Sequence, residues 1–201
     1  MKRLILMAFM LISGFAFAQT EGYKVGDVVK DFSLKNVNNK MVALADYKDA
    51  KGYIVVFTCN TCPVAKAYQE RISALNETYA VKGYPVVAIN PNDAGAVPDE
   101  SFQKMQALAS EKKFNFPYLL DPDHLVTKQF GATRTPHVFV LGKTDKGNVV
   151  EYIGAIDNDP EEANSTKVEY VKNAVNELSI GKKPAIASTK AVGCSIKWKK
   201  G

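Results

Sequence analysis

An apolar run from Tyr53 to Phe57 passes directly into the segment Thr58-Cys59-Asn60-Thr61-Cys62-Pro63. Consecutive apolar residues of this length are typical of a strand that is buried on both faces of a sheet. Pro63 suits a first helical turn. Apolar residues then recur at helical spacing, at Val64, Tyr68, Ile72, Leu75 and Tyr79. The chain therefore leaves a buried strand and enters a helix through a turn that carries two cysteines, and this favours an α/β fold.

The same alternation of patterns continues along the chain. Short alternating segments on either side of residues 36–40 predict an N-terminal β-hairpin within residues 28–47. Further strands are predicted over 84–90, 117–120, 137–141 and 148–154, and helices over 63–81, 99–113, 122–130 and 166–178. Because strands alternate with helices and the chain closes on a hairpin and a helix, we expect an α/β sandwich.

The first eighteen residues have the pattern of a signal peptide. Lys2 and Arg3 precede an apolar run over residues 4–15, and Ala16-Phe17-Ala18 has the form of a cleavage site. The apolar run is shorter than the roughly 20 residues that a membrane span takes. We therefore expect an exported bacterial protein, periplasmic or secreted, with no stable membrane insertion after the signal is cleaved.

The remaining chain has the length of one domain. We expect a domain over residues 19–180 and, after it, a lysine-rich tail over residues 181–201 that packs on the domain. The formal net charge of the whole chain is +5, and cleavage of the signal removes two of these positive charges. So mild a charge does not indicate a nucleic-acid partner.

The two cysteines of the turn lie where a helix is expected to begin. Unpaired backbone N–H groups and the helix dipole stabilise a thiolate there, and a thiolate is the species that attacks disulfides. We expect Cys59 to be the exposed attacking nucleophile and Cys62, one turn into the helix, to be the buried resolving cysteine. A zinc site needs four ligands. Because Cys194, His124 and His137 are not paired at ligand spacing, neither a metal nor another cofactor is expected.

The dipeptide Thr135-Pro136 lies directly before a predicted strand, about 75 residues after the cysteine pair. In this combination the chain resembles the thioredoxin superfamily. The resemblance implies a thioredoxin-like three-layer α/β sandwich, with a central mixed sheet flanked by helices. It also implies that Pro136 is cis and that the backbone of Thr135 pairs with a substrate's chain beside the disulfide.

Longer segments narrow this resemblance. They are similar to the redoxin (alkyl hydroperoxide reductase/thiol-specific antioxidant) branch, and within it to a peroxiredoxin-like group with a Cys-Asn-x-Cys-Pro motif. The segments are Asp31-Phe32-Ser33-Leu34, Leu44-Ala45-Asp46-Tyr47, Cys59-Asn60-Thr61-Cys62-Pro63-Val64, Thr135-Pro136 and the ending Gly193 to Lys199. The similarity covers nearly the whole mature chain and implies that the N-terminal β-hairpin extends the thioredoxin-like fold.

The cysteine pair and the resemblance together predict a thiol-disulfide oxidoreductase that exchanges dithiol and disulfide with protein substrates. Its expected partners are protein thiols or disulfides and an upstream electron donor or acceptor. A thiol-dependent peroxidase is the alternative. Peroxiredoxins carry Pro-x-x-x-Thr-x-x-Cys, whereas Val55 and Cys59 occupy the proline and threonine positions before Cys62. A copper-binding redoxin-fold metallochaperone is less favoured, because such proteins use Cys-x-x-x-Cys and this pair is one residue shorter.

Two residues keep more than one interpretation. His137 follows Pro136 and either lies near the cysteines, where an imidazole shuttles protons, or points to the other face of its strand. Cys194 is a structural thiol, an additional redox thiol in a disulfide relay, or a partner for another chain. Its setting beside Trp198 suggests a tail that packs on the body of the protein.

Overall fold

The computed structural model describes residues 22–200. The predicted signal peptide at residues 1–18 therefore lies outside the described residues. Within the described range, the helices are all too short or too polar to cross a membrane.

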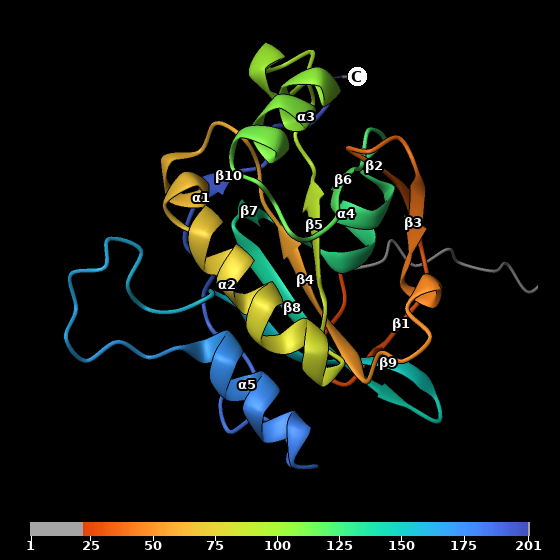
Figure 1. Cartoon of the computed structure of the whole chain (residues 1–201), viewed down its shortest axis with the longest axis vertical. Coiled ribbons are helices and arrows are strands. Elements are labelled where there is room, and N and C mark those ends of the chain that lie inside the picture. Colours follow the sequence, from red (N-terminus) through yellow and green to blue (C-terminus); the bar gives the residue numbers. More distant parts are fainter. Residues whose placement is uncertain (1–21, 201) are drawn as a thin grey trace, which may run out of the picture.

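Eight strands form one mixed sheet in the order β1-β9-β8-β4-β5-β6-β2-β3 (Figure 1). At its centre β4, β5 and β6 run parallel, and β8 runs antiparallel to β4, with His137 opposite Phe57. The hairpin of β2 and β3 is the one expected near the N-terminus, and it extends the sheet by pairing with β6. The strands are β1 (Val28–Val29), β2 (Ser33–Asn36), β3 (Met41–Ala43), β4 (Gly52–Phe57), β5 (Val86–Asn90), β6 (Tyr118–Leu120), β8 (His137–Thr144) and β9 (Gly147–Gly154).

Helices cover both faces of this sheet. They are α1 (Pro63–Ala67), α2 (Gln69–Tyr79), α3 (Phe102–Glu111), α4 (Leu125–Phe130) and α5 (Tyr170–Ser179). Successive side chains of β4 point to opposite faces. Ile54 and Val56 join the hydrophobic cluster under α2, α3 and α5. Val55 and Phe57 join the cluster that holds Phe130 of α4. The continuous apolar run of β4 is thus explained by burial on both sides, and the predicted three layers are present.

All four predicted helices have different bounds in the structure: α4 begins at Leu125 rather than at 122, α5 begins at Tyr170 rather than at 166, and the other two are divided. The helix expected over residues 63–81 divides at Tyr68 into α1 and α2, and the three-residue turn η2 (Ala80–Lys82) follows it. The helix expected over residues 99–113 divides into the turn η3 (Pro98–Glu100) and α3. The turn η3 carries Glu100, which is hydrogen-bonded to the two-cysteine turn.

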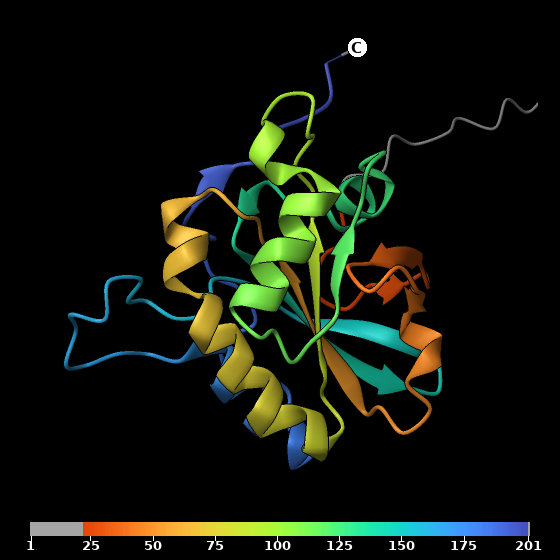
Figure 2. The same cartoon turned by 45° about the horizontal axis from the view of Figure 1, so that its top comes forward.

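The lysine-rich tail crosses the domain rather than leaving it. After α5 the chain runs beside β9, where Ile153 exchanges backbone hydrogen bonds with Ala187 and Thr189. The tail then forms β10 (Cys194–Ser195), which pairs antiparallel with β7 (Arg134–Thr135). Figure 2 shows β10 beside α1, at the end of the molecule that carries the two-cysteine turn.

Candidate active site

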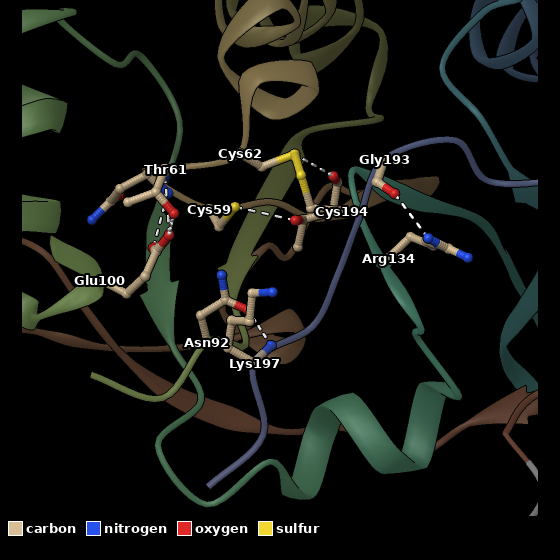
Figure 3. The surroundings of a disulfide bond; sticks show 11 residues. Cys59, Thr61, Cys62, Asn92, Glu100, Arg134, Gly193, Cys194 and Lys197 are labelled. Carbon is tan, nitrogen blue, oxygen red and sulfur yellow. Dashed lines mark hydrogen bonds between the residues drawn. A yellow bond between two sulfur atoms is a disulfide. The ribbon is translucent and has the colours of Figure 1, made fainter. Parts of the chain in front are cut away.

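Three cysteines gather where β4 ends. Cys62 forms a disulfide with Cys194, which lies 132 residues further along the chain, and their Cα atoms are 5.9 Å apart (Figure 3). Cys59 is the free cysteine of the described residues, and it joins the small hydrophobic cluster of Cys62 and Ala65. In this structure, the disulfide therefore joins the second cysteine of the turn to Cys194 of the tail, so Cys194 is not a free thiol.

The expected exposure of Cys59 is wrong, whereas the expected burial of Cys62 is confirmed. Cys59 has 2% of its surface exposed and Cys62 has 3%, so both residues are buried and the first is not the accessible one. Cys62 is also not one turn into the helix: it is the N-cap residue of α1, and Pro63 is the first helical residue. The loop from Thr58 to Thr61 folds inward instead of presenting its cysteine to solvent.

Thr135 lies between the sulfur atoms of the turn. The Thr135–Pro136 peptide bond is cis, as the resemblance implies. The Thr135 hydroxyl is hydrogen-bonded to the Cys59 sulfur at 3.1 Å, and the Thr135 carbonyl oxygen lies 3.3 Å from the Cys62 sulfur. The Thr135 backbone pairs with Cys194 of the same chain. The position that the resemblance assigns to a substrate's chain is thus filled here by the protein's own tail.

The Glu100 carboxylate anchors the two-cysteine turn through hydrogen bonds. Its carboxylate accepts hydrogen bonds from the backbone N–H groups of Asn60 and Thr61, at 2.9 and 3.0 Å, and from the Thr61 hydroxyl at 2.5 Å. Asn90 of β5 donates a further bond to it at 2.9 Å. Glu100 is fully buried, and no Lys, Arg or His side chain within residues 22–200 forms an ion pair with it. All four donors are neutral, so they fix the carboxylate without cancelling its charge.

The charge on Glu100 works against a reactive Cys59. Burial raises the pKa of the Cys59 thiol, and the nearby Glu100 carboxylate raises it further. Hydrogen bonds from Thr135 and from the backbone of Cys62 and Thr61 act in the opposite direction but are outweighed. The thiolate that we expected at a helix N-terminus is therefore not favoured at Cys59 in this state. Two of the backbone N–H groups of the turn donate to Glu100 instead.

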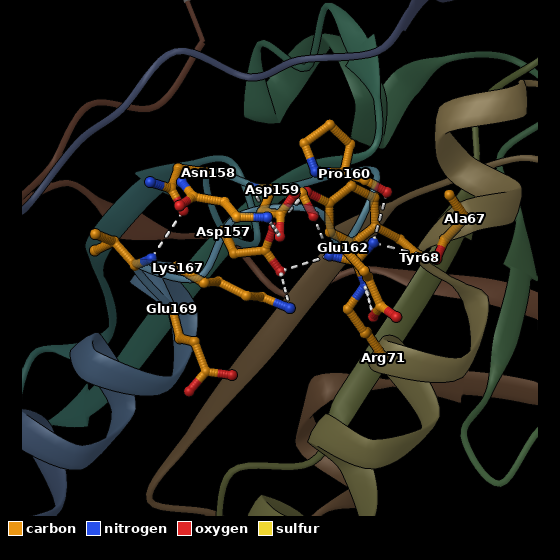
Figure 4. Close-up of polar contacts among 12 residues, drawn as sticks. Ala67, Tyr68, Arg71, Asp157, Asn158, Asp159, Pro160, Glu162, Lys167 and Glu169 are labelled. Carbon is orange, nitrogen blue, oxygen red and sulfur yellow. Dashed lines mark hydrogen bonds and ion pairs between the residues drawn. The ribbon is translucent and has the colours of Figure 1, made fainter.

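A second buried carboxylate, Asp157, lies at the side of the domain in the loop after β9 (Figure 4). It accepts hydrogen bonds from the Tyr68 hydroxyl at 2.6 Å and from the Arg71 guanidinium at 2.8 Å. Lys167 lies 3.4 Å away as a second cation. The Arg71 guanidinium also lies over the Tyr68 ring. This network ties the loop to α2 through groups of opposite charge.

His137 takes the second of its two interpretations. Its ring packs against Phe139, with the centroids 4.8 Å apart, and its Nδ1 accepts a hydrogen bond from the Thr133 N–H at 3.4 Å. Phe139 belongs to the cluster on the α4 face of the sheet. Burial lowers the pKa of His137 to about 4, so the ring is neutral at neutral pH. These contacts do not favour a proton shuttle at the cysteines.

Sequence reasoning missed three residues of the site: Glu100, Asn90 and Tyr118. The Tyr118 hydroxyl donates to the Asn60 side chain at 2.8 Å, and burial raises its pKa well above the ordinary value, with a further contribution from the charge of Glu100. A glutamate beside a predicted helix start reads as a solvated first-turn acid, so its burial left no signal. No group of three or more His, Cys, Asp or Glu side chains in residues 22–200 is placed to hold a metal ion.

Comparison with known proteins shows the family and the fold class of this chain. Residues 25–152 match the model of the AhpC/TSA family. The chain belongs to this family. Its members are redox enzymes that act on peroxides or on protein thiols. More distant solved peroxiredoxin and thioredoxin structures also superpose on the chain, which confirms the thioredoxin-like fold class.

Two solved structures resemble most of this redoxin-family chain. One is a hypothetical protein from Sinorhizobium meliloti 1021, with 30% identity, a TM-score of 0.82, and coverage of 90% of this chain and 97% of that one. The other is an uncharacterized conserved protein from Geobacillus kaustophilus, with 31% identity, a TM-score of 0.81, and coverage of 94% and 99%.

A curated relative from Haemophilus influenzae is described as "Putative peroxiredoxin bcp". It is 28% identical over 108 residues, which are 54% of this chain. The chain thus matches 64% of the length of that relative.

Proposed function

We propose that this protein is an exported thiol-disulfide oxidoreductase that exchanges disulfides with protein substrates through Cys62 and Cys59. One observation carries the proposal. The Cys62–Cys194 disulfide, the free Cys59 thiol and the buried Thr135 meet in one cluster, and Cys194 reaches it on a strand paired with Thr135. A disulfide held next to a third thiol is the arrangement that thiol-disulfide exchange needs.

The geometry favours an order of roles opposite to the one expected from the sequence. Cys62 is the cysteine that is bonded to a paired strand, so Cys62 forms the mixed disulfide with a substrate. Cys59 lies behind it and resolves that disulfide. In this step the Cys59 thiolate attacks the Cys62 sulfur and forms a Cys59–Cys62 bond. The bond from Cys62 to its partner breaks, and the partner's sulfur leaves as a thiolate that takes up the proton lost by Cys59.

Reduction of insulin disulfides by dithiothreitol, with the protein as catalyst, tests this proposal. We expect the wild-type protein to accelerate the reaction and Cys62→Ser to fall to the uncatalysed rate. The double variant Cys59→Ser/Cys194→Ser, mixed with insulin without dithiothreitol, should accumulate a mixed disulfide between Cys62 and the substrate, because both cysteines that could displace the substrate are gone. Full activity in Cys62→Ser would contradict the proposal.

A thiol-dependent peroxidase is the second candidate, because a specific observation favours it. A peroxide that oxidises Cys62 to a sulfenic acid, with release of water or an alcohol, would leave a group that Cys194 can condense with, and loss of water then gives the Cys62–Cys194 disulfide seen here. The family match and the relative described as a peroxiredoxin point the same way. Val55 and Cys59 still stand where the peroxide-binding proline and threonine are expected. Rapid, saturable consumption of hydrogen peroxide by the reduced protein would favour this candidate over the first.

Export is part of the proposal and rests on residues 1–18. We expect the protein recovered from a bacterial host to be periplasmic and to begin at Gln19. N-terminal sequencing of that fraction checks this, and a cytoplasmic protein that retains Met1 would contradict it.

A further inference from the structure

The three cysteines of the site differ in how far they are exposed. Cys59 and Cys62 are 2% and 3% exposed, whereas Cys194 is partly exposed. Resting on the proposed function, we propose that Cys194 is the point where reducing electrons enter the protein. An external thiol attacks Cys194 rather than Cys62, and the partner that carries this thiol is a dithiol protein with a negatively charged surface.

The packing around the disulfide keeps an external thiol away from Cys62. Cys62 belongs to the buried cluster of Cys59 and Ala65, and its sulfur lies 3.3 Å from the Thr135 carbonyl oxygen. A mixed disulfide on Cys62 would have to be accommodated inside this cluster. A mixed disulfide on Cys194 remains on β10, next to the exposed Ser195. Because thiol-disulfide exchange depends on access to the attacked sulfur, the oxidised protein directs attack to Cys194.

The entry of electrons at Cys194 balances in two steps. The partner's first thiolate attacks the Cys194 sulfur and forms a mixed disulfide; the Cys62–Cys194 bond breaks, and Cys62 leaves as a thiolate that takes up the proton lost by the partner. The Cys62 thiol then has an acceptor in the Thr135 carbonyl oxygen. The partner's second thiolate attacks the partner's own sulfur in the mixed disulfide. A disulfide forms within the partner, and Cys194 leaves as a thiolate that takes up the second proton.

Cys194 also acts after a substrate has been reduced. Resolution by Cys59 leaves a Cys59–Cys62 disulfide between two buried residues. The Cys194 thiolate attacks the Cys62 sulfur, a Cys62–Cys194 bond forms, the Cys59–Cys62 bond breaks, and Cys59 takes up the proton that Cys194 lost. The product has the bonding of this structure, in which Cys59 is free. The disulfide thus moves from a buried pair to a pair that includes a partly exposed cysteine.

The charge around Cys194 is positive. The exposed Arg134 donates to the carbonyl oxygen of Gly193, the residue before Cys194, at 3.1 Å (Figure 3). Arg134 forms no ion pair with a carboxylate of residues 22–200. The tail over residues 181–200 holds six lysines and no acidic residue. Because uncompensated cations favour the approach of anions, the partner that fits has acidic residues around its reactive thiol.

The first experiment identifies the attacked sulfur in the oxidised wild-type protein. The anionic thiol 2-mercaptoethanesulfonate is added, the reaction is quenched with acid after short times, and mass spectrometry of proteolytic fragments locates the adduct. We expect the adduct on Cys194 and a free thiol on Cys62. An adduct on Cys62 with a free thiol on Cys194 would overturn the proposal, and so would a disulfide that does not react.

The charge of the attacking thiol tests the class of partner. Cysteamine has the same two-carbon chain as 2-mercaptoethanesulfonate but carries a cation, and the two are compared at equal thiolate concentrations. We expect the anionic thiol to react about fivefold faster at low ionic strength, and the preference to vanish in about 0.5 M salt. Arg134→Gln should reduce the preference and Arg134→Lys should keep it. Equal rates at low ionic strength would overturn the assignment of an anionic partner.

A matched pair of variants tests the position of the tail thiol. Cys194→Ser/Ser195→Cys keeps the composition but places the thiol on the other side of β10. After the protein has been oxidised by insulin, its re-reduction by 2-mercaptoethanesulfonate should be about tenfold slower in this variant and in Cys194→Ser than in the wild type. Thermal unfolding verifies that both variants fold. A wild-type rate in either variant would overturn the proposal.

A single turnover of the reduced protein with insulin separates this proposal from the proposed function. If the wild type reduces insulin but takes up the external thiol on Cys62, the entry of electrons at Cys194 is overturned and the proposed function stands. If the reduced wild type does not reduce insulin, the proposed function falls as well.

Discussion

Two of the buried carboxylates in this molecule, Asp157 and Glu100, have opposite surroundings. Asp157 is 4% exposed and has Arg71 and Lys167 as cationic partners. Glu100 is 0% exposed and is held by neutral donors on the two-cysteine turn and on β5. Both satisfy their hydrogen-bonding capacity, so both are tolerated in the interior. The two carboxylates differ in which neighbouring groups their negative charge acts on.

The charge of Asp157 is compensated inside its own network, so it serves to hold a loop on α2. The charge of Glu100 is not compensated by a cation within residues 22–200, and it raises the pKa of Cys59 and of Tyr118. A buried carboxylate thus acts as a structural anchor in one region and controls the state of a thiol in the other. This contrast predicts that the two acids respond differently to removal.

The largest effect on stability is expected from Asp157→Asn. The substitution keeps an acceptor for the Tyr68 hydroxyl but leaves Arg71 and Lys167 without their shared anion. Since breaking a largely buried ion pair is costly, the free energy of unfolding should fall by about 3 kcal/mol. Urea unfolding measures this, and the pH dependence of Cys59 alkylation should not change. A loss below about 1 kcal/mol is typical of an exposed ion pair. It would contradict the interpretation of Asp157 as a structural anchor.

Compared with Asp157→Asn, Glu100→Gln should have a smaller effect on the free energy of unfolding and a larger effect on the pKa of the Cys59 thiol. Each Glu100 oxygen accepts from two donors, so the amide nitrogen of the variant faces two donors and unfolding should lose about 1 to 2 kcal/mol. Removal of the negative charge should lower the pKa of Cys59. Alkylation of Cys59 in the oxidised protein, followed across pH, checks this because the other two cysteines are in the disulfide. An unchanged or raised pKa would contradict the role of Glu100.

Thr135→Val should shift the pKa of Cys59 in the direction opposite to that expected for Glu100→Gln. The substitution removes the hydroxyl that is hydrogen-bonded to the Cys59 sulfur and keeps the branched shape of the side chain. The pKa of Cys59 should rise further, and unfolding should lose about 1 kcal/mol. The same alkylation profile serves as the measurement. A fall in the pKa would mean that the hydroxyl does not stabilise the thiolate.

The smallest effect concerns the pH dependence of stability. The pKa of Cys59 is raised above its usual 9.0 in the folded state, so the unfolded chain loses this proton first. The contribution is fully present below pH 9 and is lost as pH rises through the folded-state pKa. Wild-type stability should therefore decline above pH 9 more than that of Cys59→Ala. Parallel declines in urea unfolding between pH 8 and pH 10 would count against a shielded thiol.

The sequence predicted the fold well because its signals are local. The unbroken apolar run of β4 indicated burial on both faces of the sheet. Periodicity and turn residues indicated the hairpin, the strands and most helices. Thr135-Pro136 reported the cis bond only through the family resemblance. Each of these signals belongs to a few neighbouring residues, so one sequence was enough.

The site was predicted in part, because its arrangement depends on contacts between distant segments. Nothing near Cys59 shows that Glu100 lies beneath the turn or that the turn folds inward, so the cysteine expected to be exposed is buried. The pairing of Cys62 with Cys194 joins residues 132 positions apart, and although the tail was expected to pack on the domain, its sequence does not show where it crosses it. Which of three cysteines are bonded is decided by the path of that tail across β7.

The most direct test of this account is the mapping of disulfides in the nonreduced protein by mass spectrometry of proteolytic fragments, with free thiols blocked before digestion. The account predicts a fragment pair that joins Cys62 to Cys194 and a blocked thiol on Cys59. The protein is first reduced and reoxidised without any substrate, because the proposed mechanism forms a Cys59–Cys62 bond only after a substrate has been resolved. In protein treated in this way, a disulfide between Cys59 and Cys62, with the blocking group on Cys194, would contradict the prediction.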